Sequence, residues 1–142
     1  MVDVELVQLK LQELDRYLSQ LKKYKNVTAS VLKTDLDKAW TVQHGLQLSI
    51  QIVLDIGNHI LSAAGVAVHE YADIFLELAR LQIIPEAFAS TIKGMAGLRN
   101  LLVHEYTGID MVKLAEILNN SMGDFTLFAS YVAEYLSETG NS

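Results

Sequence analysis

The chain has 142 residues, no cysteine and a net charge of -6, and these features exclude several classes of protein. Without cysteine there is neither a disulfide framework nor a thiolate nucleophile, and the acidic balance disfavours a broad electrostatic grip on nucleic acid, which needs many phosphate contacts. The chain begins without a basic and then apolar leader and contains no uninterrupted apolar run of membrane-spanning length, so it predicts a cytoplasmic protein without a membrane segment.

The first half of the chain predicts three helices. Between residues 4 and 24, apolar residues recur at alternating steps of four and three, which is typical of an amphipathic helix. After the break KNVTAS, a second helix is predicted from about Asp35 to Ala64, with Gly65 as its terminating residue. A short third helix is predicted over residues 70–81.

The second half predicts two more helices. Pro85 is expected in the first turn of a fourth helix that Gly108 closes. Asp110 is expected to cap a fifth helix that continues to about Tyr135, with a kink at Gly123-Asp124.

An all-α fold follows from these segments, because no alternating strand pattern competes with them. The sequence predicts one domain over residues 1–142, built as an antiparallel bundle of about five helices. Residues 138–142 are expected to form a flexible tail.

The predicted second helix has a polar stripe along one face. At about 100° per residue, six amide, histidine and carboxylate side chains fall within one arc: His44, Gln47, Gln51, Asp55, Asn58 and His59. A solvated face is one interpretation; a hydrogen-bonded pocket lining is the other, because solvated faces favour Lys and Glu. The apolar remainder of this helix is wide enough to face both its own core and a second subunit.

The tetrapeptide VHEY occurs twice, at residues 68–71 and 103–106. Arg99 and Asn100 precede the second copy, so a helix would present them with His104 on one side and Tyr106 beside the arginine. The first copy has no cationic companion in the sequence. On spacing alone, the second group also fits side chains that satisfy the last carbonyls of a helix.

Two glycines, Gly94 and Gly97, lie inside the predicted fourth helix. Each costs about 1 kcal/mol relative to alanine in a helix interior. Close packing of another helix explains such residues, and the close approach of a ligand is the alternative.

At the second VHEY the chain resembles a known family. Arg99, His104 and Tyr106 match the R-x4-H-x-Y motif of the HepT-type HEPN ribonucleases, the toxins of HepT/MntA toxin-antitoxin pairs. The segments LQLSIQIVLDIGNHIL and YADIFLELARLQIIPEAFASTIKGMAGLRNLLVHEYTGID also resemble that family. The likeness covers about residues 35–118 closely and the termini loosely, and the five-helix layout agrees with it.

This resemblance implies a metal-independent endoribonuclease toxin that needs no cofactor and acts on RNA as a homodimer. Arg99 and His104 would be the catalytic residues. The imidazole can act as acid or base near neutral pH, and a guanidinium can bridge two phosphate oxygens. One chain supplies one such histidine, so a symmetric dimer would supply both proton-transfer groups.

Supporting roles are implied for four other residues. Asn100 would orient His104 or a phosphate, and Tyr106 would be the residue to which a partner nucleotidyltransferase antitoxin adds AMP. Asp55 and Asn58 would line the same groove, although a plain internal hydrogen bond is an equal explanation. His69, in the first VHEY, is expected to be dispensable for cleavage.

Three other interpretations remain. The chain would be a non-catalytic dimeric helical module that binds a nucleotidyltransferase or a nucleotide, or a purely structural dimer. A metal site built from His59, His69, His104 and carboxylates is the least favoured, because no paired spacing such as H-E-x-x-H supports it.

Overall fold

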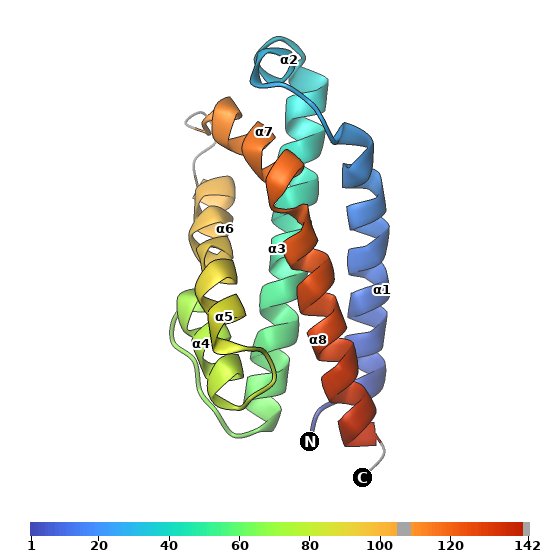
Figure 1. The fold of residues 1–142 in the computed structure, drawn as a ribbon, viewed down its shortest axis with the longest axis vertical. Helices are drawn as coiled ribbons and strands as arrows, with labels where there is room; N and C mark the ends of the chain where they lie inside the picture. The colour runs from blue at the N-terminus through green and yellow to red at the C-terminus, as the bar shows by residue number, and fades with distance from the viewer. Residues whose placement is uncertain (105–108, 141–142) are drawn as a thin grey trace.

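The computed structural model describes residues 1–104 and 109–140, and within them the chain is helical with no strand (Figure 1). Helices run up, down, up and down in the view of Figure 1, so both termini lie at one end of an antiparallel bundle. The predicted all-α fold class is confirmed. The described elements are α1 (Val4–Leu21), the 3₁₀ helix η1 (Lys22–Tyr24), α2 (Ala29–Thr34), α3 (Leu36–Ala63), α4 (Tyr71–Arg80), α5 (Glu86–Ile92), α6 (Gly94–His104), α7 (Met111–Asn120) and α8 (Met122–Gly140).

The long helix α3 is central and packs against α1, α4 and α6, and to a smaller extent against α2 and α8. The apolar arc of α3 is therefore covered within its own chain. The expectation that part of this arc faces a second subunit is wrong, because its members are all fully buried: Leu46, Ile50, Val53, Leu54, Ile56, Ile60 and Leu61.

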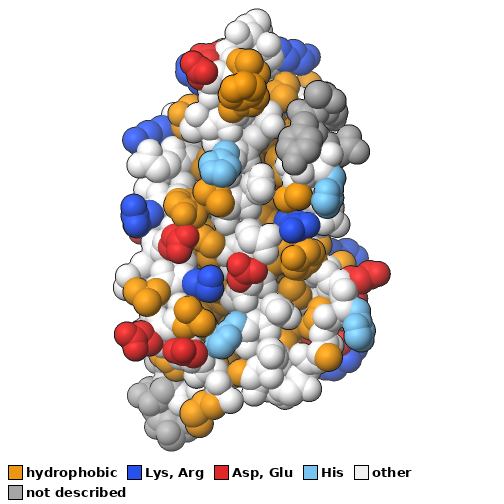
Figure 2. Space-filling model, turned by 180° about the vertical axis from the view of Figure 1, so that it is seen from behind, with side chains coloured by type: hydrophobic (Ala, Val, Ile, Leu, Met, Phe, Trp, Pro, Cys, Tyr) orange, Lys and Arg blue, Asp and Glu red, His pale blue; other side chains and the backbone are white. Residues whose placement is uncertain are grey.

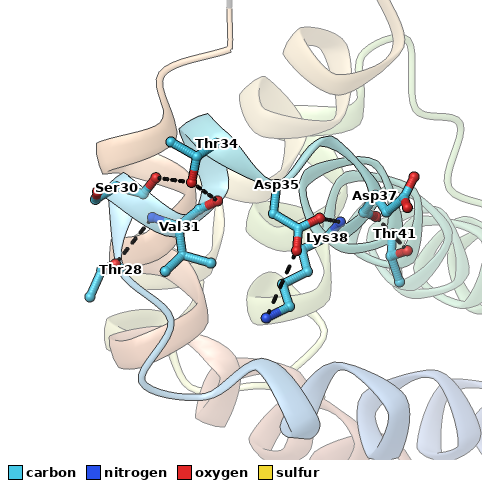
Figure 3. Close-up of polar contacts among 8 residues, drawn as sticks. All are labelled: Thr28, Ser30, Val31, Thr34, Asp35, Asp37, Lys38 and Thr41. Atoms are coloured by element: carbon cyan, nitrogen blue, oxygen red, sulfur yellow. Dashed lines mark hydrogen bonds and ion pairs between the residues drawn. The ribbon is translucent and has the colours of Figure 1, made fainter.

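Side-chain caps define where α2 and α3 begin (Figure 3). The Thr28 hydroxyl accepts a hydrogen bond from the Val31 amide at 3.2 Å, and the Asp35 carboxylate accepts one from the Lys38 amide at 3.1 Å. Such caps satisfy amides that the first turn of a helix leaves without partners. The predicted start of α3 at Asp35 and its end before Gly65 are confirmed, the latter with a left-handed φ of 79° at the glycine.

The predicted five segments are divided further in the structure. The KNVTAS break contains the start of the short helix α2, which the sequence analysis missed. The predicted fourth helix is interrupted at Lys93, directly before Gly94, and Pro85 is the N-cap residue of α5 rather than part of its first turn. The predicted fifth helix is interrupted at Ser121, two residues before the expected kink.

The stretch expected to form a flexible tail, residues 138–142, is partly helical. Helix α8 continues to Gly140, so residues 138–140 are helical, while residues 141–142 lie outside the described part of the chain. Buried side chains at regular helical spacing, from Phe125 to Leu136, hold α8 against the core.

Two helical glycines provide a matched test of packing. A Cβ added at Gly57 of α3 would overlap with Cγ2 of Ile74 on α4, whereas one added at Gly97 of α6 would have no atom within 4 Å. We expect Gly57→Ala to destabilise the protein, because overpacking costs about 1–3 kcal/mol against about 1 kcal/mol of helix propensity gained. Gly97→Ala should raise the free energy of unfolding by up to about 1 kcal/mol.

Urea denaturation of both variants measures this difference. Equal shifts of the two midpoints in the same direction would contradict the close contact between α3 and α4.

Among the described helices, none combines the length and the hydrophobicity that a membrane-spanning segment requires.

Candidate functional site

The helix that carries the second VHEY is held by two neighbours. Helix α6 packs against α3 and α4, and Met95, Ala96 and Leu102 form its buried face. This packing leaves Arg99 half-buried and Asn100 exposed at the boundary with α3 and α4.

Three neutral groups surround the guanidinium of Arg99. Its Nε donates a hydrogen bond to Oε1 of Gln51 on α3 at 3.1 Å, and one terminal nitrogen donates to Oδ1 of Asn100 at 3.2 Å. The guanidinium carbon lies 4.8 Å from the centre of the Tyr71 ring, at the start of α4. In turn, the Gln51 amide donates to Oδ1 of Asp55 at 2.8 Å. Three helices thus fix the position of one arginine.

Arg99 forms no ion pair with another described residue. It takes part in neither of the ion pairs found among the described residues, which join Lys38 to Asp35 and Arg80 to Glu77. Its second terminal nitrogen, Nη2, donates to no described residue. A fixed guanidinium with a free N–H edge can bind the oxygens of a phosphate, which prefer such planar donors.

His104 is placed differently from Arg99. It is the last residue of α6, it is exposed, and its imidazole makes no hydrogen bond or ion pair within the described part of the chain. The five-residue separation puts the two side chains about 140° apart around the helix. Tyr106 lies outside the described residues.

The two predicted polar residues of α3 lie at the same site. Asp55 is exposed and reaches Arg99 through Gln51. Asn58 is exposed and borders a cavity of about 750 Å³ together with Asn100. The structure therefore brings Asp55, Asn58, Arg99 and Asn100 together, and His104 stands at the end of the same helix.

The first VHEY lies beside Arg99 and Asn100 in the structure. Tyr71 is its last residue and lies against Arg99, and His69 borders the same cavity as Asn100. The interpretation that this copy has no cationic companion is wrong, because α4 packs against α6 and brings Tyr71 to Arg99. The two residues are 28 positions apart in the sequence.

Gln51 and Tyr71, which hold Arg99 from other helices, were not predicted as site residues. Gln51 was visible as a member of the polar stripe, four residues before Asp55 and so on the same face. For Tyr71 the only local signal was the repeated tetrapeptide. Neither signal indicates which residue of a distant helix is the partner.

Histidine side chains are spread over the face seen in Figure 2, with basic and acidic side chains between them. No group of three or more His, Asp or Glu residues among the described ones is arranged to hold a metal ion. His59 is engaged elsewhere, since its Nε2 accepts a hydrogen bond from the Asp3 amide at 3.1 Å.

Comparison with known proteins identifies the family. The family model described as "Ribonuclease HepT-like" matches residues 14–132, which is most of the chain. This chain belongs to the ribonuclease HepT-like family. The recognition made at Arg99, His104 and Tyr106 is thereby confirmed.

Two curated members of the HepT-like family are similar over most of their length. The tRNA nuclease HepT of Aphanizomenon flos-aquae is 30% identical over 137 residues, covering 95% of this chain and 92% of that protein. The mRNA nuclease HepT of Shewanella oneidensis is 27% identical over 104 residues, covering 72% and 78% of the two chains.

The fold is also shared with a solved member of this group. The tri-AMPylated HEPN toxin of Shewanella oneidensis, solved in complex with its MNT antitoxin, superposes with a TM-score of 0.81. The match is 24% identical and covers 94% of this chain and 99% of that one. The HEPN-like architecture predicted from the sequence is thus confirmed.

Proposed function

We propose that this protein is a metal-independent endoribonuclease toxin in which Arg99 and His104 are the catalytic residues. The observation that carries the proposal is the guanidinium of Arg99, held by neutral groups on three helices with one N–H edge free. Membership of the HepT-like family and the likeness to two nucleases, one named for tRNA and one for mRNA, support RNA as the substrate.

The chemistry needs a base, an acid and positive charge near the phosphate. The ribose 2′-oxygen loses its proton and attacks phosphorus, the bond from phosphorus to the 5′-oxygen breaks, and that oxygen takes up a proton. His104 serves as acid or base, and Arg99 stabilises the charge that builds on the phosphate oxygens. The products are a 2′,3′-cyclic phosphate and a 5′-hydroxyl.

A homodimer is part of this proposal. Each chain supplies one Arg99 and one His104, and a twofold arrangement gives the two proton transfers one imidazole each. The exposed Trp40 and Leu36 support a surface for the second copy, since they lie one turn apart near the start of α3 and are 62% and 58% accessible.

The proposed partner is a nucleotidyltransferase antitoxin of the MntA kind, and the proposed acceptor of its AMP is Tyr106. The solved relative, an AMPylated toxin in complex with an MNT antitoxin, supports this partner. An AMP group on Tyr106 would bring a phosphate to the end of α6, where it competes with RNA for the cation. We also propose that the toxin and its antitoxin act in the cytoplasm, where RNA and ATP are present.

Incubating the purified protein with RNA in excess EDTA tests the activity. We expect fragments that end in cyclic phosphate, and pre-incubation with the antitoxin and ATP should suppress them while adding AMP to Tyr106 in the mass spectrum. Intact RNA under all metal conditions would favour the non-catalytic module, for which the net charge of -6 is the supporting observation.

A further inference from the structure

A cavity of about 750 Å³ opens beside Arg99 where α3, α4 and α6 meet. It falls within the range of volumes, about 300–1,000 Å³, that small-ligand sites occupy. Its lining includes Asn58 of α3, His69, Glu70 and Tyr71 of the first VHEY, and Asn100 of α6.

Two of the lining residues also hold the arginine. Asn100 accepts a hydrogen bond from Arg99 at 3.2 Å, and the Tyr71 ring lies 4.8 Å from its guanidinium carbon. Because both of these partners of Arg99 line the cavity, a nucleotide whose phosphate is held by Arg99 can place its sugar or base there.

The lining suits a nucleoside better than a second phosphate. Asn58 and His69 are exposed and make no hydrogen bond to any described residue, so an amide and an imidazole are free to bond the edges of a base. Glu70 accepts hydrogen bonds from sugar hydroxyls or base amines. Its negative charge repels phosphate, which leaves the phosphate on Arg99.

Gly97 also borders the cavity. A glycine inside a helix costs about 1 kcal/mol relative to alanine, and at Gly57 the close approach of Ile74 explains that cost. No atom of the described chain lies within 4 Å of a Cβ added at Gly97, so packing within the chain does not explain this glycine.

We propose that the first VHEY, with Asn58 and Asn100, forms a nucleoside-binding subsite for the nucleotide whose phosphate Arg99 holds. The inference rests on the proposed ribonuclease function for the identity of that nucleotide as part of RNA. It replaces the expectation that His69 is dispensable: His69 contributes to binding and not to proton transfer.

Binding assays with Asn58→Ala and His69→Ala test this subsite. The probes are a short 2′-O-methyl RNA, which cannot be cleaved, free AMP, and polyphosphate as a charge control. Each variant should weaken binding of the RNA analogue or of AMP roughly 2- to 10-fold, the effect of one lost hydrogen bond, and leave polyphosphate binding unchanged. Weakening for the RNA analogue alone assigns the subsite to the substrate, and weakening for AMP alone assigns it to a mononucleotide.

Matched variants control for general effects. His44→Ala removes another exposed histidine and Asn120→Ala another exposed amide, and neither residue borders this cavity. Unchanged affinity for both nucleotide probes, or equal losses for polyphosphate, would overturn the subsite. A slower turnover of saturating RNA by His69→Ala, with affinity unchanged, would overturn it as well and make His69 a proton-transfer group.

The nucleoside subsite and the ribonuclease activity can be disproved independently of each other. If the wild-type protein leaves RNA intact but Asn58→Ala weakens AMP binding, the ribonuclease proposal fails and the nucleoside subsite stands. If RNA is cut and the variants bind as the wild type does, the reverse holds.

Discussion

Replacing Arg99 by alanine is expected to lower the rate of RNA cleavage roughly 10²- to 10³-fold, the usual cost of removing a donor that stabilises transition-state charge. Arg99→Lys keeps the charge but loses the planar fork that a phosphate prefers, so it should recover only part of the rate. Both rates are measured on labelled RNA with EDTA present. Helix content, measured by circular dichroism, should not change, because Arg99 is only half-buried.

His104→Ala should be slower still, by about 10²- to 10⁴-fold, because a general acid or base is lost. His44→Ala is the matched control and should cleave as the wild type does, since His44 is also exposed but makes no contact with the Arg99 network. Full activity in Arg99→Ala or His104→Ala would remove the catalytic assignment.

Tyr71 provides a graded comparison in the same assay. A cation–π contact is worth about 0.5–1 kcal/mol at exposed sites and about 2 kcal/mol when desolvated. Both partners are half-buried here, so Tyr71→Leu should lower the rate several-fold. Tyr71→Phe retains the ring and should be close to wild type. Similar losses in both variants would show that the hydroxyl, not the ring, is the important group.

Phe128→Ala is expected to lower the free energy of unfolding by about 3–5 kcal/mol, the usual cost of removing a buried phenyl ring. Phe128 on α8 is fully buried, and its ring meets that of Phe75 on α4 edge to face, with centroids 6.2 Å apart and planes at 83°. The variant would lose a large part of the 5–15 kcal/mol that is typical of a domain.

Leu127→Ala is the control for this substitution. Leu127 is the preceding residue on the same helix and is 41% exposed, so its loss should change the stability by no more than about 0.5 kcal/mol. Urea unfolding followed by circular dichroism compares the two. Equal losses of stability would contradict the placement of Phe128 on the buried side of α8 and Leu127 on its exposed side.

Local features of the sequence were enough to predict the helices. Asp35 and Asp110 cap α3 and α7 through hydrogen bonds to amides two or three residues ahead, and Gly65 ends α3 through its own backbone conformation. Such interactions involve neighbours in the chain, so they can be recognised without knowing the fold. The breaks at Lys93 and Ser121 were not predicted.

The R-x4-H motif was also visible in the sequence, since Arg99 and His104 lie on one helix and match a family pattern. What holds Arg99 was not visible. Gln51 is 48 residues away and Tyr71 is 28 residues away, and no helical periodicity relates them to Arg99.

The sequence by itself therefore determined that the chain is helical, to which family it belongs and which arginine and histidine carry the proposed chemistry. Only the tertiary structure decided that the first VHEY meets Arg99 and Asn100 at one site, with α3 supplying the third side. The physical reason is that capping and periodicity are set by residues within one or two turns. The neighbours of Arg99 are set by how α3, α4 and α6 bury their apolar faces against each other.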